Sequence, residues 1–565
     1  MATEVERATA CAPPMRMLLY SVAAALNNVA FGYDVGVISG SLSDMASTLS
    51  LSTFQQEMAT SGLNFVSGLG ALLVSGNLLD RLGRKPTLLI ASLLLLVGSV
   101  VVACANSFGV LLLGRALQGL GSGSGWCACT VYITEVAPTE WRGALVAVSD
   151  IGINAGILLG YALDRAVNLS LPEQPELRWR IAMGLAAALP LLYICCCHPV
   201  LPESPRWLML AGRETEATLA LRRISGLRDE ADATPRVQRE LAAMRTSLSQ
   251  RREVTWSKAL WPESRRSRRL VVIAMLLGLA QQLTGTEAIL YYTPRILNQC
   301  PGEGERASAG GGGAIALIEG GGGGAMASVE RGGECTSAET IFLVSLGVGL
   351  SKLFGELVAA AVVERTGRRA ALTTSNLLVS LAVFAIALKF ACDWPAEVGA
   401  VALSLVMLLF SLGPGPLTWV VINEVLPLAL RAKVVAIALL CNRVGSGTIA
   451  LTFLSLKEAV GVVAAFSLYG ALGLLVTCFY HFCVPDVTGQ ALEQNEDTPE
   501  VEAVGGADGG VVSAAPPQPS CPCPSLVAAC SCAADGLADA ACACSPSHVV
   551  TAPSRRGGGW TSLVD

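Results

Sequence analysis

The stretch DRLGRK at residues 80–85 follows an apolar run, and a related stretch, ERTGRR, follows another apolar run at residues 364–369. A second pattern, E-x-x-P-x-x-x-R, also occurs twice, at residues 135–142 and 424–431. Within each half of the chain, the two motifs follow the same number of apolar runs. The sequence therefore contains an internal repeat, and we expect two homologous halves.

The composition indicates a membrane protein. Of the 565 residues, 52% are hydrophobic and only 15% are charged, where soluble proteins have about 25% charged residues. About twelve apolar runs near 20 residues are long enough to cross the ~30 Å hydrocarbon core as helices. The expected spans are 17–40, 60–80, 86–105, 108–131, 144–165, 179–200, 270–297, 340–363, 370–391, 399–425, 432–456 and 461–484. The fold class is an all-α membrane protein with twelve transmembrane helices, which excludes secreted enzymes and cytosolic multidomain proteins.

Lysine and arginine follow the even-numbered spans, whereas the loop at residues 41–59 has neither. Cytoplasmic loops carry an excess of these residues, so this bias predicts that both termini are cytosolic. A net charge of −5 without a large basic block gives no reason to expect a nucleic-acid partner. The predicted parts are a cytosolic N-terminus (1–16), a first six-helix half (17–200), a cytosolic linker with short helices (201–269), a second six-helix half (270–484) containing a glycine-rich extracellular insert (298–338), and a disordered cytosolic tail (485–565).

Two homologous six-helix halves are typical of secondary transporters, which rock one half against the other around a substrate site near the bilayer midplane. Charges at the cytoplasmic helix ends would form ion pairs when the inner side is shut and separate when it opens. The alternative is that the basic residues only anchor the loops. The predicted cytoplasmic gate consists of Asp80, Arg84, Glu135, Arg142, Glu203, Arg206, Glu364, Arg368, Glu424 and Arg431.

Over residues 17–495 the chain resembles the sugar porter branch of the major facilitator superfamily. The motifs that carry this resemblance are GR at 114–115, PESPR at 202–206, QQLTG at 281–285, and GPGP at 413–416 with Trp419. INAGILLGY at 153–161, YTPRI at 292–296 and NRV at 442–444 are most similar to the plant-type polyol/monosaccharide proton symporters. The resemblance implies twelve helices, alternating access, and proton-driven uptake of a neutral sugar or polyol by a monomer in the bilayer. No cofactor or metal is expected.

Asp34 in the first span and Arg115 in the fourth are the predicted proton-coupling pair. Ionisable residues inside a membrane helix are costly and point to function. A lone carboxylate in hydrocarbon takes up a proton, whereas a nearby guanidinium favours the charged form. In the family that the chain resembles, the matching Asp couples protons in symporters. The alternative is a static pair that holds the two spans together.

The predicted substrate-binding residues are Asp150, Gln281, Gln282, Glu287, Trp419 and Asn442. Amides exchange hydrogen bonds with hydroxyls, and an aromatic ring covers the C–H face of a carbon chain. Gln281 could instead link helices, and Trp419 could be an interfacial anchor. Asp150 and Glu287 stand where many sugar porters carry Gln and Asn. They suit a polyol, yet they could also titrate, and Arg443 could neutralise one of them.

Three other readings stay open: a facilitator that needs no protons, a sugar-sensing transceptor, and vacuolar rather than plasma-membrane residence. An enzyme is not expected, because no catalytic arrangement of Ser, His, Asp or Cys is recognisable. Asn168 is a candidate glycosylation acceptor in an outer loop, and Cys300 and Cys335 flank the glycine insert as a candidate disulfide. The C-x-C spacing of the tail cysteines is not that of a common zinc site.

Overall fold

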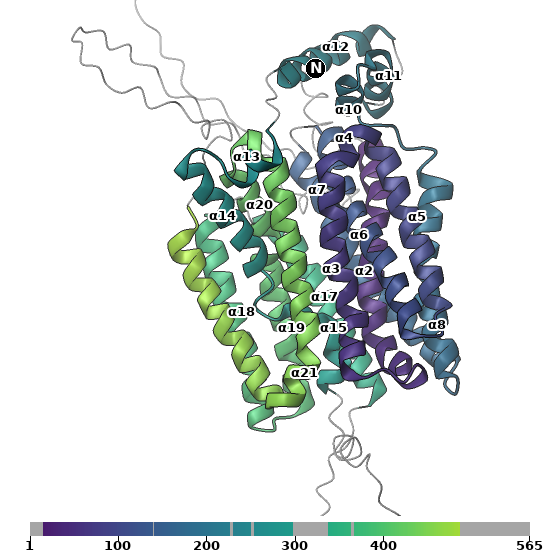
Figure 1. The fold of residues 1–565 in the computed structure, drawn as a ribbon, viewed down its shortest axis with the longest axis vertical. Coiled ribbons are helices and arrows are strands. Elements are labelled where there is room, and N and C mark those ends of the chain that lie inside the picture. Colours follow the sequence, from purple (N-terminus) through teal and green to yellow (C-terminus); the bar gives the residue numbers. More distant parts are fainter. Residues whose placement is uncertain are drawn as a thin grey trace, which may run out of the picture. The chain divides into compact units, whose positions relative to one another are not determined.

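The computed structural model describes residues 15–138, 141–225, 230–249, 254–297, 337–362 and 367–485, which belong to one compact unit. Helices make up the regular structure of these residues, and none of them lies in a strand (Figure 1). The first half contains α2 (Met15–Thr48), α3 (Thr53–Leu73), the π-helical turn η2 (Val74–Leu78), α4 (Leu79–Leu82), α5 (Arg84–Ala103), α6 (Phe108–Val136), α7 (Arg142–Ser170), α8 (Pro175–Leu185), α9 (Ala188–Leu192) and the π-helical turn η3 (Tyr193–Cys197).

The second half contains α14 (Arg265–Ala280), α15 (Thr286–Leu297), α17 (Ala338–Val362), α18 (Arg368–Ala391), α19 (Ala396–Leu412), α20 (Pro414–Val425) and α21 (Leu428–Cys483). Between the halves, the chain forms α10 (Pro205–Leu210), α11 (Glu214–Ser225), α12 (Glu230–Ser249) and α13 (Trp256–Leu260). These shorter helices lie at one end of the two bundles (Figure 1). The N-terminus, the glycine insert and the tail lie largely outside the described residues.

All twelve expected spans fall on helices. Eight helical stretches in the described part of the chain are long and apolar enough to cross a membrane, and the last of them, Leu430–Cys483, has 54 residues. At ~1.5 Å per residue that stretch is about 80 Å long, enough for two crossings. Gly461 divides it with a φ of 83°, a left-handed conformation that glycine adopts without a steric cost. The predicted spans 432–456 and 461–484 are therefore two helices, which meet at the non-helical Gly461 within α21.

Two expected spans are broken helices. The span at 270–297 is divided into α14 and α15 by a turn that ends at Gly285, whose φ is 75°. The span at 399–425 is interrupted at Gly413, and α20 begins with Pro414 in its first turn. Proline has no N–H for a helical hydrogen bond, so it fits the first turn of a helix, where that N–H would have no partner within the helix. Broken helices expose backbone carbonyls, which is how transporters build their central sites.

Close packing of α2 against α7 fixes the wall that carries the candidate site. A Cβ atom on Gly32 would lie 1.9 Å from the backbone oxygen of Ile153, and one on Gly156 would lie 2.1 Å from that of Val29. Only glycine allows the two backbones to approach so closely, as is common where membrane helices pack. Asp34 on α2 and Asp150 on α7 are therefore held on adjoining helices.

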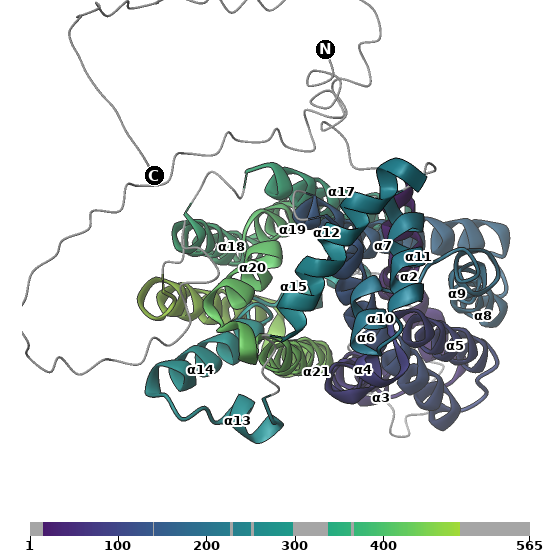
Figure 2. The ribbon, with the colours of Figure 1, turned by 90° about the horizontal axis from the view of Figure 1, so that it is seen from above.

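The two halves meet along three pairs of helices: α3 with α21, α2 with α15, and α7 with α17 (Figure 2). Asn64 donates to the Tyr291 hydroxyl at 3.1 Å, and Tyr161 donates to the Leu290 carbonyl at 3.0 Å. Glu57, at the end of α3 away from α10–α13, accepts hydrogen bonds from the backbone N–H and the hydroxyl of Ser455. These contacts tie the halves together beside the pocket and at that end.

Candidate functional site

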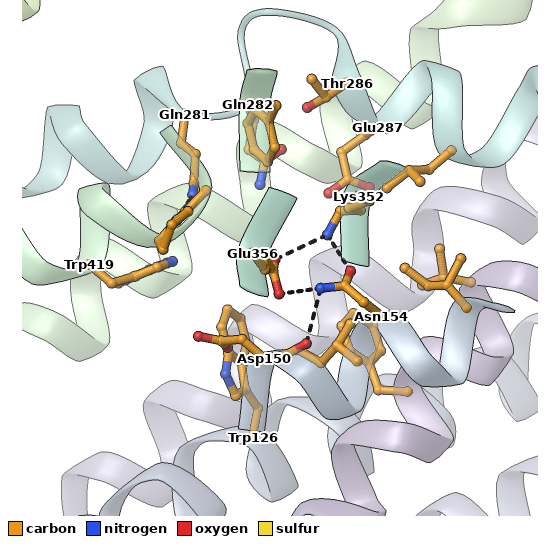
Figure 3. Close-up of a pocket in the computed structure, with 18 of the residues that line it drawn as sticks. Trp126, Asp150, Asn154, Gln281, Gln282, Thr286, Glu287, Lys352, Glu356 and Trp419 are labelled. Carbon is orange, nitrogen blue, oxygen red and sulfur yellow. Dashed lines mark hydrogen bonds and ion pairs between the residues drawn. The ribbon is translucent and has the colours of Figure 1, made fainter. Parts of the chain in front are cut away.

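A pocket lies between the two halves (Figure 3). α2, α6 and α7 of the first half contribute to its wall. The second half contributes the turn after α14 and the helices α15, α17, α19, α20 and α21. Its polar and aromatic lining residues include Trp126, Asp150, Asn154, Gln281, Gln282, Glu287, Lys352, Glu356, Trp419 and Arg443. Five of the six predicted substrate-binding residues are among them, and Asn442 is not.

Asn442 is fully buried and holds the two glutamines in place. Its amide donates to the Gly278 carbonyl at 2.9 Å and to Oε1 of Gln281 at 2.6 Å, and its Oδ1 accepts from Gln282 at 3.2 Å. In this structure Asn442 is thus a positioning residue behind the pocket wall rather than part of its lining.

The two glutamines differ in which of their side-chain polar atoms are free to form another hydrogen bond. The Gln281 amide donates to the carbonyls of Pro414 and Gly415 at 2.9 and 2.8 Å, so it joins the end of α14 to the first turn of α20. This geometry agrees with the helix-linking alternative for Gln281. Oε1 of Gln282 is buried and has no hydrogen-bond partner among the described residues. An unpaired buried acceptor costs free energy, so Oε1 of Gln282 is available to accept a hydrogen bond from a group in the pocket.

Aromatic rings form another part of the wall. Trp419 packs edge to face against Trp126, with 5.8 Å between ring centroids and an interplanar angle of 81°. The guanidinium of Arg443 lies 5.2 Å from the Trp126 ring. Trp419 therefore faces the pocket, whereas the interfacial-anchor alternative placed it at the membrane surface. Trp126 was missed from the sequence, although its place deep in the fourth span was an available signal.

Sequence reasoning also missed three polar residues that meet between α7 and α17. The ammonium of Lys352 lies 2.7 Å from Oδ1 of Asn154, and the Asn154 amide donates to Glu356. Lys352 and Glu356 are one helical turn apart and 3.8 Å from each other. Two charges inside a membrane span are costly and mark function, so their presence in the expected span 340–363 was a usable signal.

The predicted proton-coupling pair is formed. Arg115 on α6 donates to Oδ2 of Asp34 on α2 at 2.5 Å, and its Nε donates to the Ala59 carbonyl at 2.8 Å. The two side chains are 0% and 3% exposed. Asp34 itself does not line the pocket, but Phe31 and Val35 of the same helix do. The pair thus lies directly behind the pocket wall.

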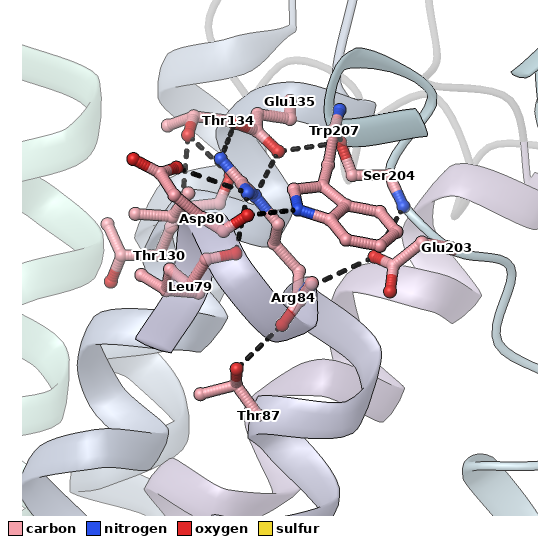
Figure 4. Close-up of polar contacts among 12 residues, drawn as sticks. Leu79, Asp80, Arg84, Thr87, Thr130, Thr134, Glu135, Glu203, Ser204 and Trp207 are labelled. Carbon is pink, nitrogen blue, oxygen red and sulfur yellow. Dashed lines mark hydrogen bonds and ion pairs between the residues drawn. The ribbon is translucent and has the colours of Figure 1, made fainter. Parts of the chain in front are cut away.

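At the end that carries α10–α13, Arg84 is the centre of a polar network (Figure 4). Its guanidinium makes two 2.7 Å hydrogen bonds to Glu135 and a third, of 2.9 Å, to the Leu79 carbonyl. Ser204 donates to the same Glu135 carboxylate at 2.6 Å. Asp80 lies 3.5 Å from Arg84 and is the most exposed member. The network joins α4, α5 and α6 to the segment before α10.

Glu203 accepts backbone N–H groups at the start of α5. The donors are Arg84 and Lys85, at 3.1 and 3.2 Å, and Ser204 contributes a third N–H at 2.7 Å. Burial raises the pKa of the Glu203 carboxyl above its usual value, and these backbone hydrogen bonds act in the opposite direction. Negative charge is also favoured at a helix N-terminus, so Glu203 caps α5.

The second half has a related but looser arrangement. Arg368 lies 3.3 Å from Glu424, and Arg431 donates to the Leu426 carbonyl at 3.1 Å. Both Arg84–Glu135 and Arg368–Glu424 are contained in one half, so neither ion pair crosses between the halves. Two further members of the predicted gate, Arg142 and Arg206, are exposed. Glu364 lies outside the described residues.

One sequence expectation is wrong. Asn168 lies in the last turn of α7 rather than in a loop, and its amide donates to Asp164 at 2.9 Å. Arg443 hydrogen-bonds Oδ1 of Asn442. Among the two acids that it could neutralise, Glu287 is the one whose charge acts on it. No cluster of three His, Cys, Asp or Glu side chains suited to a metal ion occurs in the part of the chain that the structure describes. Cys300, Cys335 and the tail cysteines lie outside that part.

Two bundles of membrane helices around a polar pocket define a membrane transport protein. The profile of the sugar (and other) transporter family matches residues 20–305 and 334–498, and the chain belongs to this family. It is 33% identical to probable polyol transporter 4 of Arabidopsis thaliana, over 84% of this chain and 83% of that protein. It is 29% identical to the galactose-proton symporter of Escherichia coli, over 84% and 92% of the two chains.

The fold matches solved structures of the xylose transporter from Escherichia coli. With its partially occluded inward-open form the TM-score is 0.67 at 21% identity, covering 85% of this chain and all of the other. The same transporter bound to 6-bromo-6-deoxy-D-glucose gives a TM-score of 0.66 at 22% identity, covering 85% and 98%. The chain therefore has the twelve-helix major facilitator fold that its sequence predicted.

Proposed function

We propose that the protein is a proton-coupled symporter of a polyol or monosaccharide that works by alternating access. The observation that carries this proposal is the sealed Asp34–Arg115 pair directly behind a pocket shared by two halves. The names of relatives support it, since they include polyol transporters and a galactose-proton symporter. We place the protein in the plasma membrane with both termini cytosolic, as the distribution of basic loops favours, and assign transport to the monomer.

The coupling step follows from the pair's hydrogen bonding. Oδ1 of Asp34 and one terminal nitrogen of Arg115 are buried without a partner among the described residues. The free carboxylate oxygen is where a proton would bind. Protonation removes the negative charge and weakens the attraction to the guanidinium, which allows α2 and α6 to separate. A neutral carboxyl then crosses between the two access states at a lower cost than a bare charge.

The available free energy is sufficient for accumulation. One charge moved through 100 mV releases ~2.3 kcal/mol, and one pH unit adds about 1.4 kcal/mol. Together they amount to about 3.7 kcal/mol, which supports roughly a several-hundred-fold gradient of a neutral solute.

The pocket suits a neutral cargo rich in hydroxyl groups. Gln282 offers an unpaired acceptor, Asp150 and Glu287 offer carboxylate oxygens, and the rings of Trp126 and Trp419 offer apolar faces for C–H groups. A site with buried polar groups rejects analogues that leave those groups unpaired. We assign cargo binding to these residues, and positioning of the glutamines to Asn442.

We assign the Arg84 and Arg368 networks to closure of the cytoplasmic side. Their ion pairs lie within each half, so they would act by fixing the helix ends of that half rather than by bridging the halves. The exposed Arg142 and Arg206, together with Glu364, are assigned to the same region through the repeated motif.

An electrogenic substrate screen in oocytes at acidic external pH tests the proposed function. The unmodified protein should give inward current with a polyol or sugar, and a protonophore should abolish accumulation of that cargo. An accumulation ratio unchanged by the protonophore would contradict symport and favour the facilitator. Removal of residues 490–565 should leave uptake unchanged, and normal uptake without this tail would count against the sugar-sensing transceptor.

A further inference from the structure

The pocket carries more charge than a neutral cargo requires. Three carboxyl side chains, Asp150, Glu287 and Glu356, and two cationic ones, Lys352 and Arg443, line it. Only Lys352 and Glu356 form an ion pair with each other among the described lining residues. Their side chains are 12% and 13% exposed, so the pair is shielded from water and its hydrogen bonds matter more than at a surface.

This pair reaches across the boundary between the halves. Lys352 and Glu356 are on α17 of the second half, and both engage Asn154 on α7 of the first half (Figure 3). The Asn154 carbonyl oxygen accepts from the ammonium, while its amide nitrogen donates to the carboxylate. We call Asn154, Lys352 and Glu356 the α7–α17 bridge. The Asn154 side-chain amide thus bonds to one donor, the Lys352 ammonium, and to one acceptor, the Glu356 carboxylate, which lie side by side.

A bridge between two moving halves cannot stay intact through a rocking cycle. When α7 and α17 separate, the ammonium and the carboxylate each lose a partner. Both side chains are largely shielded from water, so this loss is costly unless another group replaces the partner. The replacement must accept from Lys352 and donate to Glu356 at neighbouring positions. Two adjacent hydroxyl groups do this, because a hydroxyl both donates and accepts.

We propose that Lys352 and Glu356 are specificity-determining residues that exchange the Asn154 amide for a vicinal diol of the cargo. One hydroxyl accepts from Lys352 and its neighbour donates to Glu356, so cargo binding releases the α7–α17 bridge. This inference rests on the proposed function, since it names the part of the cargo that the pocket recognises. It adds a link between recognition and the relative motion of the halves.

The test pairs protein variants with cargo analogues. Sorbitol, xylitol and myo-inositol, together with their monodeoxy analogues, are compared by competition binding to the full chain and to Lys352→Met and Glu356→Gln. In the unmodified protein, loss of either hydroxyl of the recognised diol should weaken binding roughly tenfold to hundredfold, as expected for a hydrogen bond to a charged group. Lys352→Met lacks the ammonium, so it should bind the analogue without the hydroxyl that contacts Lys352 nearly as well as it binds the parent polyol.

In a second variant the affinity for the polyol should change in the opposite direction. Asn154→Ala removes the internal competitor and leaves Lys352 and Glu356 available, so polyol binding should strengthen by roughly twofold to tenfold. A purely structural bridge would instead give weaker binding. Lys389→Met is the matched control, because this buried lysine lies on α18 against Phe390, outside the pocket lining. Its loss should leave the affinity lost with each monodeoxy analogue unchanged.

The inference would be overturned if Lys352→Met and Glu356→Gln reach the surface normally and lose as much affinity for the monodeoxy analogues as the unmodified protein does. Polyol transport itself would not be contradicted by that result. If those variants do not reach the surface, weaker binding in Asn154→Ala overturns the inference. If the unmodified protein binds none of the probes, the polyol branch of the proposed function and this inference fail together.

Discussion

Arg115 and Asp34 are 81 positions apart in the chain, yet they form a 2.5 Å hydrogen bond sealed from solvent. The pair is only half satisfied, because the second carboxylate oxygen and one guanidinium nitrogen have no partner among the described residues. A buried ion pair with leftover polar atoms is poor evidence for stability. These unpaired atoms support our proposal that the pair separates during a proton cycle instead of being a static link between α2 and α6.

Asp34→Asn should abolish proton-linked current while part of the cargo binding remains, because Asn keeps an acceptor for Arg115 but takes up no proton. Currents at several external pH values and equilibrium binding measure the two effects separately. Asp44→Asn is the matched control, since Asp44 is on the same helix and pairs with Arg178 at 2.8 Å. Acid-dependent current that persists in Asp34→Asn would remove this residue from the coupling step.

Arg84→Ala should destabilise the first half strongly. It leaves the Glu135 carboxylate without its two 2.7 Å partners, and breaking a buried pair costs about 3–5 kcal/mol. A thermal unfolding scan of purified protein in detergent measures the loss. Arg81→Ala removes an exposed arginine from the same motif and should change the midpoint little. Equal midpoints for the two variants would show that the network carries no stability.

Stability should depend on pH through Glu203. Burial raises the pKa of this acid in the folded state, above an unfolded value of roughly 4.3. A raised folded-state pKa favours the protonated form, so the contribution is fully present below the unfolded value and is lost as pH rises through the folded one. Glu203→Gln does not titrate. Its unfolding midpoint relative to the unmodified protein should therefore increase between pH 4 and neutrality.

The control for this pH effect is Glu216→Gln, which changes an exposed acid of the linker paired with Arg213. Its midpoint difference from the unmodified protein should stay nearly flat over the same range. A difference for Glu203→Gln that falls with rising pH would mean that the backbone N–H groups outweigh burial at this site.

Glu57→Ala should loosen the end of the bundle opposite α10–α13. The Glu57 side chain is buried and accepts from the backbone N–H and hydroxyl of Ser455 at 2.8 and 2.6 Å, across the two halves. Hydrogen bonds to a charged group contribute about 1.5–3 kcal/mol each. Spin labels placed with unnatural amino acids at the exposed positions Phe54 and Val460 should report longer distances in this variant.

Glu458→Ala is the comparison for the Glu57 variant. Glu458 accepts from Thr53 at 2.9 Å across the same boundary, but the contact is exposed. Its loss should therefore lengthen the label distance much less. If both variants leave the distance distribution unchanged, the Glu57–Ser455 contact does not hold this end closed.

The sequence predicted the twelve spans, the two related halves and the Asp34–Arg115 pair. Each prediction depends on local physics: apolar length sets a span, motif spacing reveals a repeat, and a charge in hydrocarbon demands a partner. The structure confirmed the helices and brought the two charges together. Gly285 marks one helix break and Gly413 with Pro414 marks the other, although each span was predicted as one continuous helix.

Only the tertiary structure decided which polar groups meet in the pocket. Asn154 and Glu356 are 202 positions apart, and their contact depends on how α7 packs against α17. The Gln281 amide nitrogen is occupied by the carbonyls of Pro414 and Gly415, whereas Oε1 of Gln282 has no hydrogen-bond partner among the described residues. Hydropathy fixes where a segment lies in the bilayer, but the partner of a buried polar group depends on helix rotation and register. Those are set by side-chain packing between distant segments.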